Sequence, residues 1–141
     1  MLARFCALEH ARRHIGVREQ PPGSNRGPLI DRWNEGAGVP LGSAWCMAFQ
    51  HAMFRECGVT LGGWGSVERF EEWARAHAEL VRRPFRGDLV CYDWNSDGWA
   101  DHVGIVERVL ALRWRGRVFA GLIRTIEGNT GDAVRRRTRW V

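Results

Sequence analysis

The segment GSAWCMAFQHAM, residues 42–53, places a cysteine where a helix is expected to begin. A cysteine in the first turn of a helix lies beside unpaired backbone N–H groups and the positive end of the helix dipole. Both stabilise the thiolate, which is the nucleophilic form, and the same N–H groups can bind an oxyanion. Cys46 could instead be an inert core thiol, because free cysteine is often buried. A nucleophilic role therefore requires a base.

His102 is the candidate base. It opens the segment HVGIVERV, whose alternation predicts a strand with His102, Gly104 and Val106 on one face. Gly104 is expected to leave room beside the imidazole for a helix that carries Cys46. A structural role at the strand edge is the alternative for His102. The other histidines fall on polar helix faces or further along the helix of Cys46: His10, His14, His77 and His51.

A histidine base needs a partner that orients its second ring nitrogen. Two candidates, Glu127 and Asn129, lie in the segment IEGNT. A carboxylate would stabilise the imidazolium, whereas an amide would fix the orientation of the ring without adding charge. In an extended chain Glu127 shares the side of Thr125, and the glycine that follows lets the chain turn before Asn129. We therefore favour Glu127 as the orienting residue, with Asn129 nearby as a hydrogen-bond donor.

Helices are expected to precede strands along the chain. Four segments with helical periodicity come first, over residues 2–15, 29–34, 44–57 and 66–80. Four β-branched or alternating segments follow Pro84: LVCYDW, HVGIVERV, RVFAGLIRTI and RRRTRWV. This order favours an α+β fold with an antiparallel sheet over alternating βαβ units. A length of 141 residues favours one domain over residues 1–141.

Composition limits the partners and the compartment. The net charge of +5 is carried by arginines and favours an anionic partner, either nucleic acid or a bacterial wall polymer. Four scattered cysteines without a CxxC pair predict free thiols made in a reducing compartment. The N-terminus lacks the apolar stretch of a signal peptide, and no segment approaches the roughly 20 apolar residues of a membrane span. Synthesis in the cytoplasm, with release by another route, is the expectation.

The segment DWNSDGWAD, residues 93–101, partly matches a calcium-binding loop. Asp93, Asn95 and Asp97 have the required spacing, but position twelve is Gly104 rather than glutamate. The alternative is a tight turn whose side chains bind their own backbone. No cofactor is required for the expected chemistry, and calcium, where bound, would be structural.

Aromatic and loop residues supply candidates for substrate binding. Four tryptophans are expected in or near loops that flank Cys46 and His102, with at least half of them buried: Trp45, Trp64, Trp94 and Trp99. Trp45, Trp99 and Asn25 are the candidate substrate-binding residues. Asn25 belongs to a loop that could simply close over the fold. The segment RRRTR, residues 135–139, could contact nucleic acid, but a solvated edge strand is the preferred interpretation.

Together these motifs resemble the CHAP domain, the cysteine, histidine-dependent amidohydrolases/peptidases of bacterial and phage peptidoglycan hydrolases. The resemblance rests on three segments in the family's order: GSAWCMAFQHAMFRECGV, RGDLVCYDWNSDGWADHVGIVERV and IRTIEGNT. The leading IGVREQPPGSNRGPLIDRW is similar to that of many phage-type members. The resemblance implies a papain-like fold, related to the NlpC/P60 superfamily, with N-terminal helices packed on an antiparallel sheet. It also implies Cys46 as nucleophile, His102 as base, and Glu127 or Asn129 as orienting residue.

The implied substrate is bacterial peptidoglycan, cut either between muramic acid and the first alanine or within the stem or cross-bridge peptide. The sequence does not choose between these bonds. A monomeric phage lysin or antibacterial effector is expected, with no specific nucleic-acid partner. Two alternatives stay open: a catalytically idle CHAP-like module that binds or docks, and an arginine-rich nucleic-acid-binding protein.

Overall fold

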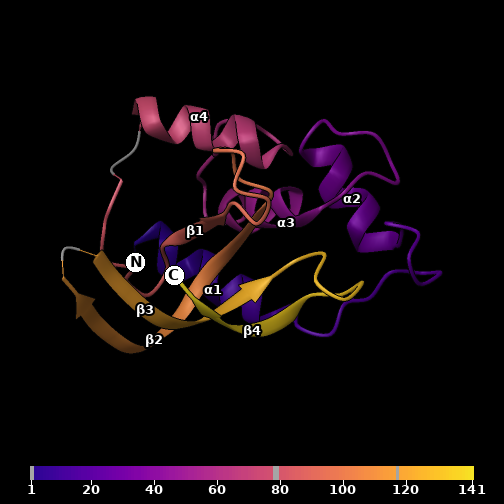
Figure 1. Ribbon diagram of the computed structural model, residues 1–141. Helices are drawn as coiled ribbons and strands as arrows, with labels where there is room; N and C mark the ends of the chain where they lie inside the picture. The colour runs from indigo at the N-terminus through magenta and orange to yellow at the C-terminus, as the bar shows by residue number, and fades with distance from the viewer. Residues whose placement is uncertain (1, 78–79, 117) are drawn as a thin grey trace.

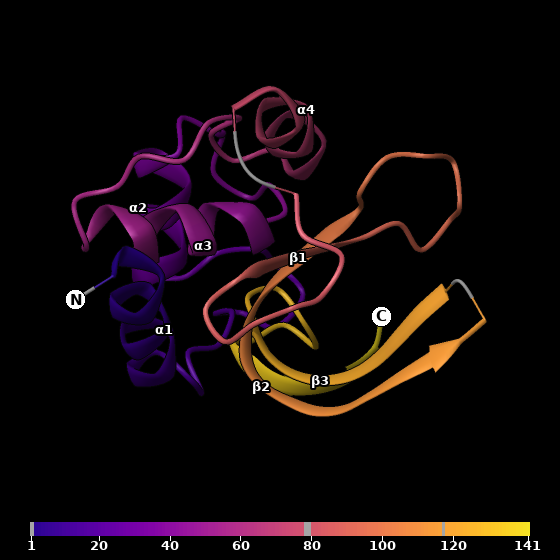
Figure 2. The same ribbon diagram turned by 90° about the vertical axis from the view of Figure 1, so that its left-hand side faces the viewer.

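The computed structural model describes residues 2–77, 80–116 and 118–141. Four helices come first: α1 (Ala3–Arg13), α2 (Pro28–Gly36), α3 (Cys46–Arg55) and α4 (Val67–His77). Four strands follow: β1 (Leu89–Tyr92), β2 (His102–Arg115), β3 (Val118–Glu127) and β4 (Arg135–Trp140). This order confirms the predicted α+β class, with the helices gathered beside a strongly curved sheet (Figure 1, Figure 2). Among the described residues, the helices are too short or too polar to cross a membrane.

The four strands form an antiparallel meander in the order β1-β2-β3-β4. The register pairs Tyr92 with His102 at one end of the sheet and Glu127 with Arg135 at the same end. Two irregularities in β2, at Glu107 and at Leu110, shift its pairing with β3. Bulges of this kind increase local bending, and the β2–β3 hairpin curls away from the helices in Figure 2.

The predicted helix boundaries hold with small changes. Gly58 adopts φ 77°, as expected for a residue that follows the end of α3. The backbone N–H of Arg69 donates to the hydroxyl of Ser66 (3.3 Å), so Ser66 caps α4 as predicted. The predicted helix over residues 66–80 is described over Val67–His77, and residues 78–79 lie outside the described part of the chain.

Helix α3 is the centre of the core. Eight of its ten residues are buried, which is expected for a helix that is apolar on most of its circumference. It packs against α1, α2 and β2, and Phe49 meets the ring of Trp33 from α2 (5.0 Å between centroids). The core therefore fixes both the position and the direction of the helix that begins at Cys46.

The expectation of four free thiols is wrong for two of them. Cys6 in α1 and Cys57, just after α3, form a disulfide with a Cα–Cα distance of 5.9 Å, while Cys46 and Cys91 are free. The two partners are 51 residues apart in sequence, so their spacing carries no signal. Packing of α1 against α3 brings them together. A disulfide of this kind is typical of an oxidising environment.

Replacing both Cys6 and Cys57 with serine is expected to lower the free energy of unfolding by roughly 2–4 kcal/mol, because the disulfide closes a long loop in the unfolded chain. Urea denaturation of the two forms measures the difference. A dithiothreitol-treated wild type should match the double variant. Equal midpoints for oxidised wild type and double variant would show that the disulfide does not stabilise the fold.

Candidate active site

Cys46 is the first residue of α3, and its side chain is 7% exposed. No side chain caps this helix, so the N–H groups of its first turn stay available for an anion. Burial raises the pKa of the Cys46 thiol to about 11, although the backbone N–H groups of Met47, Cys46 and Val103 act in the opposite direction. A thiol in this state ionises at neutral pH only if a nearby base takes its proton.

His102 is the first residue of β2 and lies beside the start of α3, since the backbone N–H of the next residue, Val103, interacts with the Cys46 thiol. The imidazole is buried, and its Nε2 lies 2.8 Å from Oε2 of Glu127. Because an ionised carboxylate only accepts hydrogen bonds, Nε2 carries the proton in this pair. Nδ1 is then the ring nitrogen that can exchange a proton with a thiol.

Glu127 is fully buried at the end of β3 and accepts hydrogen bonds from three side chains. Besides His102, Thr125 donates to Oε1 (2.6 Å), and Arg139 donates through Nε to Oε1 (3.0 Å) and through Nη2 to Oε2 (2.7 Å). Burial alone would raise the pKa of Glu127, but the bonds from His102, Arg139 and Thr125 outweigh it and hold that pKa at about 2. The carboxylate therefore stays charged across the neutral range.

Arg139 was not identified as a site residue from the sequence. The segment RRRTR does form an edge strand, as predicted, because β4 ends the sheet. However, alternate side chains of β4 point inward, and Arg139 reaches the buried carboxylate of Glu127. The period of two along β4 is a signal for such alternation, but it does not say which carboxylate lies opposite.

The predicted role of Gly104 is wrong. Its missing side chain does not make room for a helix. A Cβ at Gly104 would lie 2.8 Å from Cγ of Glu127 and 3.2 Å from Cβ of Thr125. Gly104 therefore makes room for the carboxylate that contacts His102.

Gly104→Ala is expected to lower hydrolytic activity about ten- to a hundred-fold, because the added methyl displaces Glu127 from His102 at an overpacking cost of roughly 1–3 kcal/mol. Gly121→Ala is the matched control, since its Cβ would approach Leu112 and Val141 at 3.3 and 3.4 Å, away from His102. Activity per folded molecule, determined with circular dichroism, checks the effect. Equal activity in both variants would remove Gly104 from the site.

Asn129 follows the end of β3 with a left-handed backbone, φ 55°. Asparagine tolerates this conformation better than most residues, which accounts for its presence in the turn. Among the hydrogen bonds of the described residues, none joins the Asn129 side chain to His102, whereas Glu127 contacts it directly. Glu127, which the sequence favoured over Asn129, is therefore the residue that contacts the imidazole.

Two aromatic rings pack on the imidazole. The ring of Trp94 stacks on His102 with 4.7 Å between centroids, and Tyr92, paired with His102 across β1 and β2, stacks at 6.1 Å. The guanidinium of Arg139 lies 5.2 Å from the Trp94 centroid. Trp94 is 57% exposed, so it forms an aromatic surface directly beside the imidazole. Tyr92 was missed because only strand pairing places it there.

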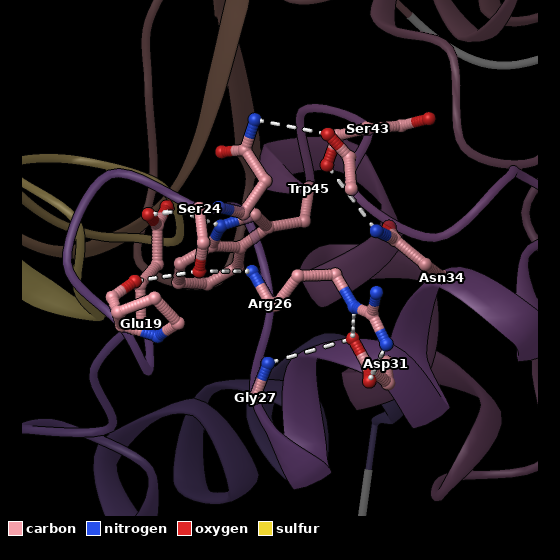
Figure 3. Close-up of polar contacts among 11 residues, drawn as sticks. Glu19, Ser24, Arg26, Gly27, Asp31, Asn34, Ser43 and Trp45 are labelled. Atoms are coloured by element: carbon pink, nitrogen blue, oxygen red, sulfur yellow. Dashed lines mark hydrogen bonds and ion pairs between the residues drawn. The ribbon is translucent and has the colours of Figure 1, made fainter.

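Trp45 does not line a groove, and its predicted role in substrate binding is wrong. It is fully buried, and its Nε1 donates to Oε1 of Glu19 (2.9 Å). The other oxygen of Glu19 accepts the backbone N–H of Asn25 (2.9 Å), and the Asn25 side chain donates to the carbonyl of Gly42 (3.2 Å). Figure 3 shows this network of the loop around Trp45. In this conformation Asn25 holds the loop in place, which is the role that the sequence allowed as the alternative to substrate binding.

Further contacts in Figure 3 fasten the same loop to α2. Arg26 pairs with Asp31 (2.8 Å), and the buried amide of Asn34 donates to the carbonyl of Ser43 (3.2 Å). Segments before and after α2 are thereby joined close to Cys46. The network positions the start of α3, where the thiol and the free N–H groups lie.

The tryptophans are less buried than expected. Of the four that were expected near the site, only Trp45 is buried, whereas Trp64, Trp94 and Trp99 are exposed by 58%, 57% and 44%. Trp99 lies in the loop before β2, with Arg75 5.9 Å from its centroid. It remains a candidate for substrate binding.

The loop over residues 93–101 is held by its own backbone. Asp93 accepts the N–H groups of Asp97 and Gly98 (3.2 and 2.9 Å), and Asp101 accepts that of Trp94 (2.9 Å). These are the contacts of a tight turn, the alternative that the sequence allowed. Asn95 also donates to Asp97 (3.1 Å), so all three side chains predicted to bind calcium take part in hydrogen bonds within the loop. Calcium binding by Asp93, Asn95 and Asp97 stays a prediction.

Comparison with known proteins gives one match. The family model of the CHAP domain matches residues 38–129, well over half of the chain. The matched range contains Cys46, His102, Glu127 and Asn129. No curated protein and no solved structure matches the chain.

Proposed function

The chain belongs to the CHAP domain family, and on that premise we propose that it is a cysteine amidase or peptidase that hydrolyses an amide bond of bacterial peptidoglycan. One observation supports this most strongly: the thiol of a free cysteine at the uncapped start of α3 interacts with the backbone N–H of Val103, and the residue before Val103 is a buried histidine that is hydrogen-bonded to a buried carboxylate. This arrangement matches the logic of a nucleophile, a base and an orienting group.

In the first half of the proposed reaction, the Cys46 thiol transfers its proton to Nδ1 of His102, and the thiolate attacks the carbonyl carbon of the amide. The C–S bond forms as the carbonyl π bond opens, and the N–H groups at the start of α3 bind the resulting oxyanion. The protonated His102 then donates its proton to the leaving nitrogen, so that the C–N bond breaks and an acyl-enzyme remains.

In the second half, neutral His102 takes a proton from water, which attacks the thioester. The C–S bond then breaks, and the thiol is restored. Glu127 stays ionised throughout, since its pKa is held at about 2, and it stabilises each imidazolium form of His102. Arg139 balances the charge of Glu127 and fixes its orientation through two hydrogen bonds.

The enzyme is proposed to act on the wall after release from the cytoplasm by another route, where the Cys6–Cys57 disulfide suits an oxidising environment. A catalytically idle CHAP-like module is the main alternative. The buried Glu127 argues against it. Burying a carboxylate costs desolvation energy, even with hydrogen bonds from three side chains, and a module without catalytic activity gains nothing from that cost.

Mass spectrometry of fragments released from purified peptidoglycan tests the proposal and names the bond. New amino groups on alanine, with free lactyl groups on muramic acid, would identify an amidase. New peptide termini would identify an endopeptidase. Release of no fragment by the folded protein, from peptidoglycans with direct and with bridged cross-links, would contradict the proposal and favour the idle module.

A further inference from the structure

Two adjoining pockets beside α1 and on β2–β4 form one trough lined by arginines. Their volumes are about 400 and 470 Å³, and they share Arg86, Glu107 and Arg108. We call this surface the arginine trough, defined by its basic residues: Arg12, Arg83, Arg86, Arg108, Arg124 and Arg136. Of the lining residues that the structure describes, Glu107 is the only acidic one.

The charge of the trough is only partly neutralised. Glu107 is buried and pairs with Arg12 (2.9 Å) and with Arg136 (2.8 Å). Arg86 pairs with Glu9 (3.2 Å) outside the trough. Within the described part of the chain, no carboxylate lies within ion-pair distance of Arg108 or Arg124. Arg83 has no carboxylate partner among the described residues either, so three arginines of the trough keep an unpaired charge.

Two of these unpaired arginines, Arg108 and Arg124, lie at directly opposite positions of the sheet. Arg108 of β2 is the register partner of Arg124 of β3, which is in turn the partner of Thr138 of β4. Like charges at directly opposite positions of a sheet destabilise it. An anion held between the two guanidinium groups would relieve this repulsion, and the exposed hydroxyl of Thr138 would offer a third donor.

The trough is separate from the candidate active site. Side chains of β4 alternate between the two faces of the sheet, and Arg136 and Thr138 belong to the more exposed set. Arg139, which holds Glu127, belongs to the other set. A ligand in the trough would therefore leave the contact between His102 and Glu127 undisturbed.

We propose that the arginine trough binds a linear polyanion of the cell wall whose charges are phosphodiesters, as in teichoic acids. Guanidinium groups match the geometry of phosphate oxygens, and two adjoining pockets suit several charges along one chain. The choice of a wall polymer over nucleic acid rests on the proposed function. It is also favoured because, among the described residues that line the trough, Phe85 is the only aromatic one, and Arg83 already covers its ring (5.4 Å). Single-stranded nucleic acids usually stack on several aromatic rings.

The test is the affinity of the full chain for purified glycerol-phosphate teichoic acid, measured by isothermal titration at several salt concentrations. The variant Arg108→Gln/Arg124→Gln removes the two unpaired charges that lie opposite each other on the sheet. Arg32→Gln/Arg69→Gln is the matched control, with two exposed helix arginines and the same change in net charge. We expect the trough variant to bind about ten-fold or more weakly than wild type. The slope of log affinity against log salt concentration should also become less steep by about two. The control should stay within about two-fold of wild type.

Equal affinities for the two variants would overturn the proposal. It would also be overturned if a single-stranded oligonucleotide of equal charge bound more tightly than teichoic acid and lost affinity in the trough variant, because the trough would then serve nucleic acid. Measuring hydrolysis as well as binding distinguishes failure of this inference from failure of the proposed function. The trough variant should digest teichoic-acid-free peptidoglycan at the wild-type rate and teichoic-acid-bearing walls more slowly. Trough-dependent binding by a protein that hydrolyses neither wall would support the trough and contradict the proposed enzyme.

Discussion

Cys46→Ala is expected to lower the rate of peptidoglycan hydrolysis by about 10⁴-fold or more, since no other group supplies the nucleophile and the proposed acyl-enzyme cannot form. The free energy of unfolding should change by only about 1–2 kcal/mol, because the substitution removes one sulfur atom. Turbidity of a wall suspension measures the rate, and urea denaturation measures the stability. His102→Ala should give the same pair of results.

Cys91→Ala is the matched control for Cys46→Ala. Cys91 is the other free cysteine of the chain, and burial raises the pKa of its thiol to about 12. Its loss should leave the rate within about two-fold of wild type. A Cys46→Ala variant that remains folded and hydrolyses walls as fast as Cys91→Ala would remove Cys46 from the reaction. An unfolded Cys46→Ala variant would move this residue from the site to the core.

Glu127→Gln is expected to lower kcat/KM about ten- to a thousand-fold. Glu127 is ionised at neutral pH, because its pKa is held at about 2, and an anion beside an imidazole stabilises the protonated ring. Glu127→Gln removes that stabilising charge. The basic limb of the pH profile should therefore move to lower pH, which kcat/KM measured across the pH range will show.

Glu107→Gln provides the control for Glu127→Gln. Glu107 is also a buried carboxylate of the sheet held by arginines, but it pairs with Arg12 and Arg136 and not with His102. We expect Glu107→Gln to lower the free energy of unfolding and to leave the basic limb of the pH profile in place.

Asn129→Ala should lower the rate with little movement of either limb of the pH profile. If Glu127→Gln were close to wild type and Asn129→Ala inactive, Asn129 would be the orienting residue.

Residues with a local signal were found from the sequence. The helix that begins at Cys46 follows from the periodicity of the residues after it, and the strand that begins at His102 follows from alternation. The contact between Glu127 and His102 was favoured because an extended chain places Glu127 and Thr125 on one side, and these two residues share a hydrogen bond in the structure. Order along the chain was enough to give the α+β class.

Residues that depend on pairing between distant segments were not found. Arg139 reaches Glu127 only because β4 pairs with β3 in a particular register. Glu127, which lies on another strand, leaves no room for a side chain at position 104. Trp45 is turned into the core by a hydrogen bond to Glu19, 26 residues earlier. None of these contacts can be predicted from the spacing of residues along the sequence, because tertiary packing determines them.

The rate of alkylation of Cys46 by iodoacetamide as a function of pH tests the central claim most directly. Burial raises the pKa of the thiol to about 11, so fast reaction at neutral pH requires that His102 hold the proton of the thiol. Peptide mass spectrometry compares Cys46 with Cys91, the more exposed of the two free thiols. We predict that Cys46 reacts at pH 7 about a hundred-fold faster than Cys91 and that His102→Ala abolishes the difference. Reaction of Cys46 only at strongly alkaline pH, at a rate unaffected by His102→Ala, would contradict the account.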